Sequence, residues 1–105
     1  MAFQNTKGRY ASFGVATSIS PEIIDSFWRI IDDYLKGVFP LDNVLIFRIL
    51  KNKENKVSIE YSNRQKSLRI VFDFLFQYDP FLPKTVYILD NKGIETILLS
   101  HEISL

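Results

Sequence analysis

Residues that could perform catalysis are few and scattered in this sequence. It has no Cys and a single His, His101, which stands next to Glu102 near the end of the chain. A thiolate zinc site and a cysteine nucleophile are therefore excluded, and a Ser–His pair would need a histidine that we expect to be solvated. The carboxylates Asp32 and Asp33 diverge by about 100° on a helix, where we expect Asp32 to pair with Lys36. We predict no enzyme, no metal and no other cofactor.

Basic side chains are concentrated in one stretch of the chain. From Arg48 to Arg69, seven Lys or Arg residues stand against two Glu, a local charge of +5, whereas the remainder carries −4. This pattern is typical of a patch for nucleic acid or another anionic partner. The alternative is a set of solvated lysines that protect a sheet edge, and we favour it because no aromatic residues alternate with the charges. The candidate anion-binding residues are Arg48, Lys51, Lys53, Lys56, Arg64, Lys66 and Arg69.

Aromatic side chains are concentrated immediately after this basic stretch. Five of the 15 Phe, Tyr and Trp residues lie within the ten positions from 72 to 81. Two interpretations stay open. Either the loop around Pro80 and Pro83 folds over these rings, or the rings form an exposed apolar patch that binds another protein or a second copy of the chain. The candidate partner-binding residues are Phe72, Phe74, Phe76, Tyr78 and Phe81.

An amphipathic helix over residues 21–36 is the clearest element that positions these side chains. Ser20 is a good N-cap, Pro21 suits the first helical position, and Gly37 can adopt the left-handed conformation that ends a helix. Apolar residues from Ile23 to Leu35 recur at helical spacing and share one side, whereas charged residues share the other. The helix therefore needs an apolar partner surface.

A hairpin is expected after the helix. Residues 44–50 and 57–61 are apolar segments that flank a polar stretch, which is typical of two strands joined by a turn. We expect Phe47 to face Ile59, because this register places the apolar residues of both strands on one face.

Other segments also have the composition of strands. Residues 68–77 fit a strand by alternation and a helix by the spacing of their polar residues, and the Ile, Val and Phe content favours the strand. Near the start of the chain, a central glycine, Gly14, suggests a strand with a bulge. In the last hairpin, Gly93 is free to adopt a positive φ in the turn. Strands are therefore expected at residues 9–18, 68–77, 84–90 and 94–99.

These elements predict a single domain spanning residues 1–105. Its order is one strand, one helix and about five further strands, which gives a two-layer α+β fold with the helix on a mostly antiparallel sheet of five to six strands. The sequence shows no signal peptide and no apolar run that could span a bilayer, and the net charge is +1. We therefore expect a cytoplasmic protein that does not bind membranes.

Short motifs, in order along nearly the whole chain, match those of a known family. They are Arg9-Tyr10, Gly14-Val15, Ile19–Glu22, Trp28–Asp32, Val44–Phe47, Asn63–Gln65, Val86–Asp90 and Thr96–Leu99. With these motifs the chain resembles domain-of-unknown-function family 960, small proteins of Firmicutes and their mobile elements. The resemblance implies a bacterial protein of this fold and no mechanism. Residues 68–76 depart from the family, because they are far more apolar than the charged strand that is usual there.

Together these observations predict a non-enzymatic protein-interaction module. Its partner is another protein, with a homodimer through the aromatic strand as one form of the interaction. The alternative is weak binding of nucleic acid or another anionic partner through the segment from Arg48 to Arg69, in which nucleic acid is the less favoured ligand.

Overall fold

The computed structural model describes residues 2–63 and 65–103, and in these residues six strands form one sheet. Neighbouring strands are antiparallel except β1 and β6, which are parallel. The order across the sheet is β1-β6-β5-β2-β3-β4, so β1 and β4 are its edges. The strands are β1 (Gly8–Ala11), β2 (Val44–Lys51), β3 (Lys56–Asn63), β4 (Leu68–Gln77), β5 (Thr85–Asn91) and β6 (Ile94–Leu99).

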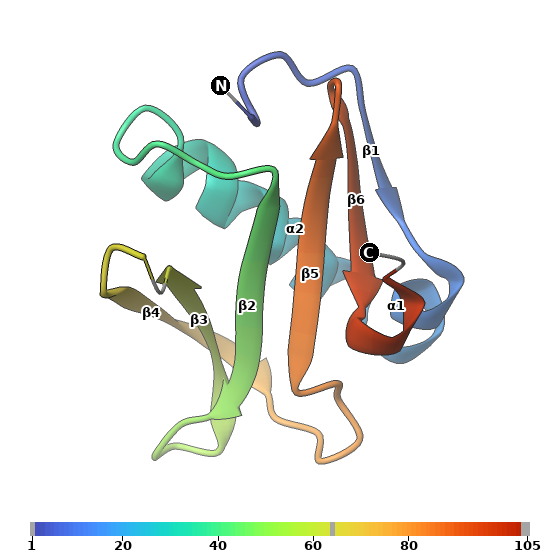
Figure 1. The fold of residues 1–105 in the computed structure, drawn as a ribbon. Coiled ribbons are helices and arrows are strands. Elements are labelled where there is room, and N and C mark those ends of the chain that lie inside the picture. The colour runs from blue at the N-terminus through green and yellow to red at the C-terminus, as the bar shows by residue number, and fades with distance from the viewer. Residues whose placement is uncertain (1, 64, 104–105) are drawn as a thin grey trace.

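The predicted helix forms and covers one face of the sheet. It consists of α2 (Pro21–Ile30) and a final π-helical turn, η1 (Ile31–Leu35). Ser20 caps it by accepting a hydrogen bond from the backbone N–H of Ile23, and Gly37 follows it with a φ of 79°. In Figure 1, α2 lies behind the sheet, so the face toward the viewer is not covered by it. We call this side the open face and the other side the helix face. The predicted α+β fold is confirmed.

The hydrophobic core lies between α2 and the helix face. Phe47 on β2 is central, because its ring centre is 5.3 Å from that of Phe27 and 5.6 Å from that of Tyr61. All three side chains are almost completely buried. Burial raises the pKa of the Tyr61 phenol above its ordinary value, since the charged form would be poorly solvated there.

The predicted strand over residues 9–18 is wrong beyond Ala11. A short helix, α1 (Phe13–Ser18), follows instead, with Ser12 as its N-cap. Glu102, in the short helix η2 (Ser100–Glu102), accepts hydrogen bonds from the Ser12 hydroxyl at 2.6 Å and from the Gly14 N–H at 3.0 Å. A Cβ at position 14 would lie 2.7 Å from this carboxylate, so Gly14 permits a close helix contact and does not mark a bulge.

The predicted register of the first hairpin is wrong by two residues, although the buried face is correct. Phe47 is opposite Tyr61, and Ile49 is opposite Ile59. The turn sets this register, because the Asn52 side chain accepts hydrogen bonds from the N–H groups of Glu54 and Lys56. Burial alone cannot distinguish the two registers, since a shift of two residues returns each side chain to the same face.

The structure confirms two further sequence predictions. Residues 68–77 form a strand, whose side chains alternate between half-buried and exposed. The last hairpin closes directly at Lys92 and Gly93, which both have a positive φ, as a type I′ hairpin turn requires. No helix within the described residues is long and apolar enough to cross a membrane.

Candidate functional site

The outer strand β4 has one free edge. It pairs with β3 along one side, and no other strand of the described chain lies along the opposite side. In a strand of this kind every second residue directs its N–H and C=O groups to the free side. Natural edge strands are commonly short or bulged, or carry Lys or Pro. β4 has ten residues and neither Lys nor Pro, and its pairing with β3 is regular over residues 68–73, with a bulge beyond Asp73. The regular part of this edge, residues 68–73, can therefore pair with another strand.

An apolar row lies on the helix face of β4. Its side chains are half-buried against the outer margin of the core, because β4 is the last strand of the sheet. The ring of Phe72 is 5.2 Å from that of Tyr34 in η1, and Phe74 stacks on Phe76 at 5.6 Å. The row thus joins the core on one side and borders the free edge on the other. Its members are Leu68, Ile70, Phe72, Phe74 and Phe76.

Charged and apolar side chains alternate along the open face of β4. Arg69 donates from Nε to Oε2 of Glu60 at 2.6 Å, and only 2% of Glu60 is exposed. Val71, which is 49% exposed, lies between Arg69 and Asp73 on this face. The carboxylate oxygen Oδ1 of Asp73 accepts a hydrogen bond from the hydroxyl of Ser58. Both charged groups of β4 are therefore held in place by buried residues of β3.

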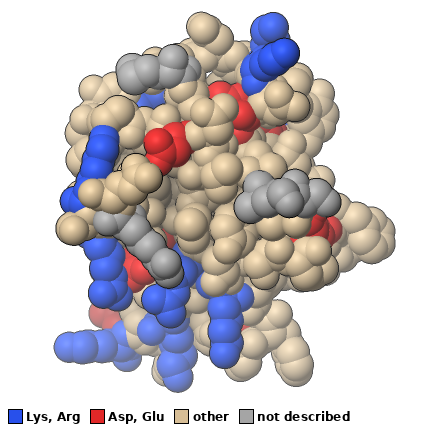
Figure 2. Space-filling model, in the orientation of Figure 1, with Lys and Arg blue, Asp and Glu red and all other residues tan. Residues whose placement is uncertain are grey.

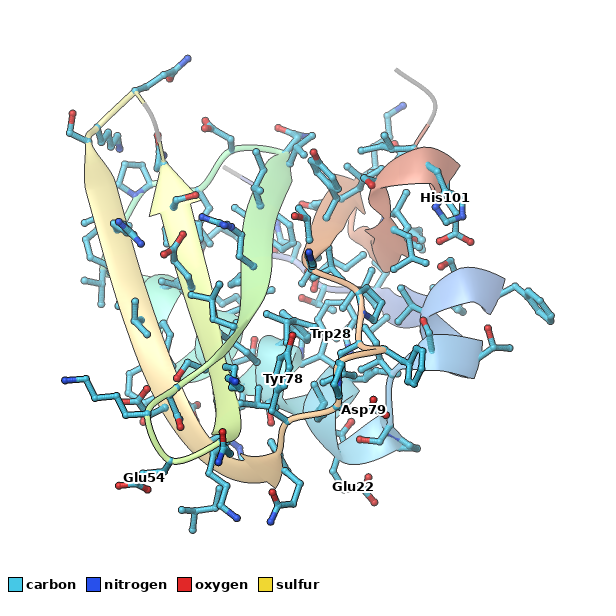
Figure 3. All side chains as sticks on the ribbon, turned by 90° about the horizontal axis from the view of Figure 1, so that it is seen from below. Glu22, Trp28, Glu54, Tyr78, Asp79 and His101 are labelled. Atoms are coloured by element: carbon cyan, nitrogen blue, oxygen red, sulfur yellow. The ribbon has the colours of Figure 1, made fainter. Side chains whose placement is uncertain are left out.

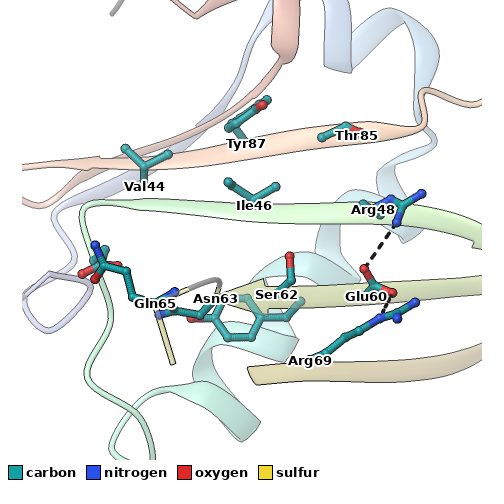
Figure 4. Close-up of a pocket in the computed structure, with 12 residues that line it drawn as sticks. Val44, Ile46, Arg48, Glu60, Ser62, Asn63, Gln65, Arg69, Thr85 and Tyr87 are labelled. Carbon is teal, nitrogen blue, oxygen red and sulfur yellow. Dashed lines mark hydrogen bonds and ion pairs between the residues drawn. The ribbon is translucent and has the colours of Figure 1, made fainter. Parts of the chain in front are cut away.

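A shallow trough of about 640 Å³ lies on the open face, where β5, β2 and β3 run side by side (Figure 4). Its floor is partly apolar, with Ile46 and Tyr87 opposite each other. At one end, Arg48 approaches Oε1 of Glu60 to 3.8 Å, on the other side of this carboxylate from Arg69. The structure thus brings together two of the predicted anion-binding residues, but around a carboxylate that neutralises part of their charge.

The other predicted anion-binding residues do not converge at this trough. Lys51, Lys53 and Lys56 lie in and beside the turn between β2 and β3, and Lys66 lies in the turn at the opposite end of β3. Figure 2 shows Lys and Arg along one side of the open face and at its lower end, where the β2–β3 turn lies. Arg64 falls outside the described residues.

Two predicted partner-binding residues lie in the loop that follows β4. Figure 3 shows Tyr78 and the adjacent Asp79 in this loop, and Tyr78 is half-buried against the core. The Tyr78 N–H donates to the backbone carbonyl of Asn55 at 3.1 Å, which ties the loop to the β2–β3 turn. Phe81, in contrast, is 91% exposed. The aromatic run therefore divides into a half-buried row and one exposed ring.

The strongest polar cluster was missed by the sequence analysis. Arg9 on β1 forms two hydrogen bonds to Asp32 of η1, one of them 2.7 Å long, and donates from Nε to Glu95 of β6 at 2.9 Å. Its guanidinium carbon is 4.9 Å from the ring centre of Trp28. The hydrogen bonds to Asp32 are the main cause of a raised pKa of Arg9 and of a lowered pKa of Asp32.

This cluster joins β1, β6 and the helix through side-chain hydrogen bonds. Glu95 is completely buried and also accepts a hydrogen bond from the Thr6 hydroxyl at 2.6 Å. The expected pair of Asp32 with Lys36 is present at 3.6 Å, but it is secondary to the contact with Arg9. The available signal was Glu95, the only charged residue of a mostly apolar strand, because a buried carboxylate needs a partner.

The other candidate catalytic residues of the sequence, His101 and Glu102, lie in η2. His101 is exposed, and the neighbouring Glu102 is engaged with α1, where the hydrogen bond from Ser12 lowers its pKa. Among the described residues, no three His, Cys, Asp or Glu side chains lie close enough to hold a metal ion.

The fold and this surface define a two-layer α+β domain with an open sheet face and a long free strand edge. The chain belongs to domain-of-unknown-function family 960, described as staphylococcal protein of unknown function, whose model matches residues 8–102. It is also similar to a crystal structure of a protein of unknown function from Enterococcus faecalis. The two share 40% sequence identity and a TM-score of 0.89, over 93% of this chain and 92% of the other. The comparison with curated proteins gives no match.

Proposed function

We propose that this domain is a non-enzymatic protein-interaction module that receives an extended segment of a protein along the free edge of β4. The observation that carries the proposal is the combination of a ten-residue edge with a half-buried apolar row beside it. In strand addition the backbone hydrogen bonds supply affinity and the alternating side chains supply specificity. β4 offers both components over the same residues.

The charged residues of β4 support this use of the edge. Natural proteins protect long edges with lysines, prolines or bulges, because unpaired strands associate indiscriminately. On β4 the only charges are Arg69 and Asp73, and each is fixed by a hydrogen bond to β3. A fixed pair of opposite charges selects the register of an incoming strand and rejects segments of the wrong pattern.

Site-specific photo-crosslinking tests this proposal. A photoreactive amino acid replaces Val71 on β4 or, as a control, Tyr10 on the opposite edge strand β1. The two side chains are similarly exposed, at 49% and 56%, and both lie on the open face. In host cells, we expect a covalent adduct with a protein chain from position 71 and none from position 10. Adducts from position 10 alone, or from neither position, would contradict the proposal.

An anionic partner is the second candidate function. It is favoured by the lysines of the β2–β3 turn, since Lys51, Lys53 and Lys56 gather there beyond the charged pairs around Glu60. Such a site would bind phosphate groups by charge and without sequence preference. It is the weaker candidate, because these lysines do not converge with Arg48 and Arg69, which lie around Glu60.

A further inference from the structure

We infer that the segment that occupies the β4 edge is β4 of a second copy of this chain, in antiparallel orientation. This inference rests on the proposed function of the edge and adds the identity and register of its occupant. A two-fold axis perpendicular to the sheet would pass beside Val71, so that Val71 faces itself. Arg69 of each copy would then lie opposite Asp73 of the other.

The charges on the open face favour this register over its neighbours. With the axis at Asp73, two carboxylates would face each other, which destabilises a strand pair. With the axis at Ile70 or Phe72, each charged side chain would face an uncharged one. Only the axis at Val71 creates two opposite-charge pairs, and directly opposed pairs of this kind stabilise antiparallel strands.

Contacts within each copy hold Arg69 and Asp73 in place before the copies associate. Glu60 engages the Nε atom of Arg69, and Ser58 engages the Oδ1 atom of Asp73. Among the described residues these are the hydrogen bonds that the two side chains make, so the terminal guanidinium nitrogens and Oδ2 remain for the second copy. Because the side chains are already ordered, pairing costs less side-chain entropy than it would for free surface residues.

The apolar row agrees with the same register. An axis perpendicular to the sheet keeps the helix faces of both copies on one side, so Ile70 would meet Phe72 and Leu68 would meet Phe74 of the other copy. The pairing of β4 with β3 is regular from Leu68 to Asp73, and its only irregularity lies beyond Asp73. Residues 68–73, which carry both charged pairs, therefore form a regular segment, and Phe74, the partner of Leu68 in this register, is the first residue of the bulge that follows.

Charge reversal tests the occupant and the register together. By sedimentation equilibrium, we expect a wild-type dimer, and for Asp73→Arg a dimer dissociation constant raised roughly 10- to 100-fold, because two attractive pairs become repulsive. Arg69→Asp is expected to weaken the dimer similarly. An equimolar mixture of the two variants restores opposite charges at both positions, so it should form a heterodimer. A monomeric wild type at every concentration, or a mixture that fails to associate, would overturn the inference.

Arg69→Asp removes a partner of buried Glu60 and can therefore disturb the fold. A second test uses cysteine variants that leave Arg69 unchanged. The natural chain has no cysteine, so Val71→Cys introduces the only one. Opposed residues of antiparallel strands have Cα atoms about 4.5–5.5 Å apart, which suits a disulfide. Leu75→Cys is the control, because in this register the two cysteines would be about 27 Å apart at ~3.4 Å per residue. We expect a reducible dimer from Val71→Cys alone, and equal dimer from both variants would contradict the register.

The two proposals fail in different ways. If the photo-crosslink at position 71 captures a chain other than this one and Val71→Cys gives no disulfide, the edge binds a foreign strand and the second-copy inference is overturned. If position 71 captures nothing and Val71→Cys stays monomeric, both proposals are overturned. A crosslinked product of twice the chain mass supports both.

Discussion

Arg9 makes contacts that no other single side chain of the described structure combines. It joins an edge strand, a buried carboxylate on β6, the end of the helix and the face of Trp28. The short strand β1 has four residues and would be weakly held by its backbone pairs alone. An arginine suits this position because its planar group can bind two carboxylates and stack on an aromatic ring together.

Asp32→Asn tests the contribution of this contact to stability. Folding lowers the pKa of Asp32 below its ordinary value of 3.8, mainly through hydrogen bonds from Arg9. The stabilisation is therefore complete above that value and is lost as the pH falls through the lower, folded-state pKa. At neutral pH we expect the variant to lose about 1 kcal/mol of unfolding free energy, since the pair is partly exposed to solvent.

Urea unfolding at a series of pH values provides the measurement. The difference between wild type and Asp32→Asn should be constant near neutrality and should narrow below about pH 4. Asp33→Asn, at the next position and without a contact to Arg9 in the described structure, serves as the control. A difference that does not change with pH would show that the charge of Asp32 is irrelevant to stability.

Elements that depend on nearby residues could be predicted from the sequence, whereas those that depend on distant residues could not. The helix was found because Ser20, Pro21 and Gly37 are local signals. The helix α1 was missed because its cap is stabilised by Glu102, 90 positions from Ser12. In the same way, composition identified the aromatic row, but the free edge beside it follows from a sheet order in which β5 pairs with β2 instead of β4.

Phe74→Glu and Phe47→Ala compare a side chain at the margin of the core with one at its centre. Phe74 is half-buried, so we expect the variant to remain folded, to lose about 1–2 kcal/mol of stability, and to be monomeric if β4 pairs with a second copy. Phe47→Ala removes a fully buried ring and should cost about 3–5 kcal/mol. Circular dichroism during unfolding measures the loss of stability, and light scattering measures the oligomeric state. An unfolded Phe74→Glu would show that this ring is an essential part of the core.

The β2–β3 turn allows a separate test of the anionic-partner candidate. If this turn binds single-stranded DNA, the Lys53→Gln/Lys56→Gln double variant should reduce the salt slope of log K by about 1.4, at roughly 0.7 per lost phosphate contact. Fluorescence anisotropy with a labelled oligonucleotide at several salt concentrations measures this slope. Lys7→Gln/Lys92→Gln removes the same charge at the opposite end of the molecule and should leave the slope unchanged. An affinity for DNA that does not change with salt concentration would contradict the anionic-partner candidate.

At the scale of the whole molecule, a dimer through β4 would extend the sheet from six to twelve strands and would leave the open faces continuous. Because the folded dimer contains contacts that the unfolded chain lacks, its melting temperature should rise with protein concentration. Asp73→Arg, whose dimer is weaker, should move this dependence to higher protein concentrations, while Asp25→Arg, an equal charge change on α2, should keep the dependence of the wild type. Differential scanning calorimetry over a range of concentrations measures both. A melting temperature of the wild type that is independent of concentration would show that folding is not coupled to association.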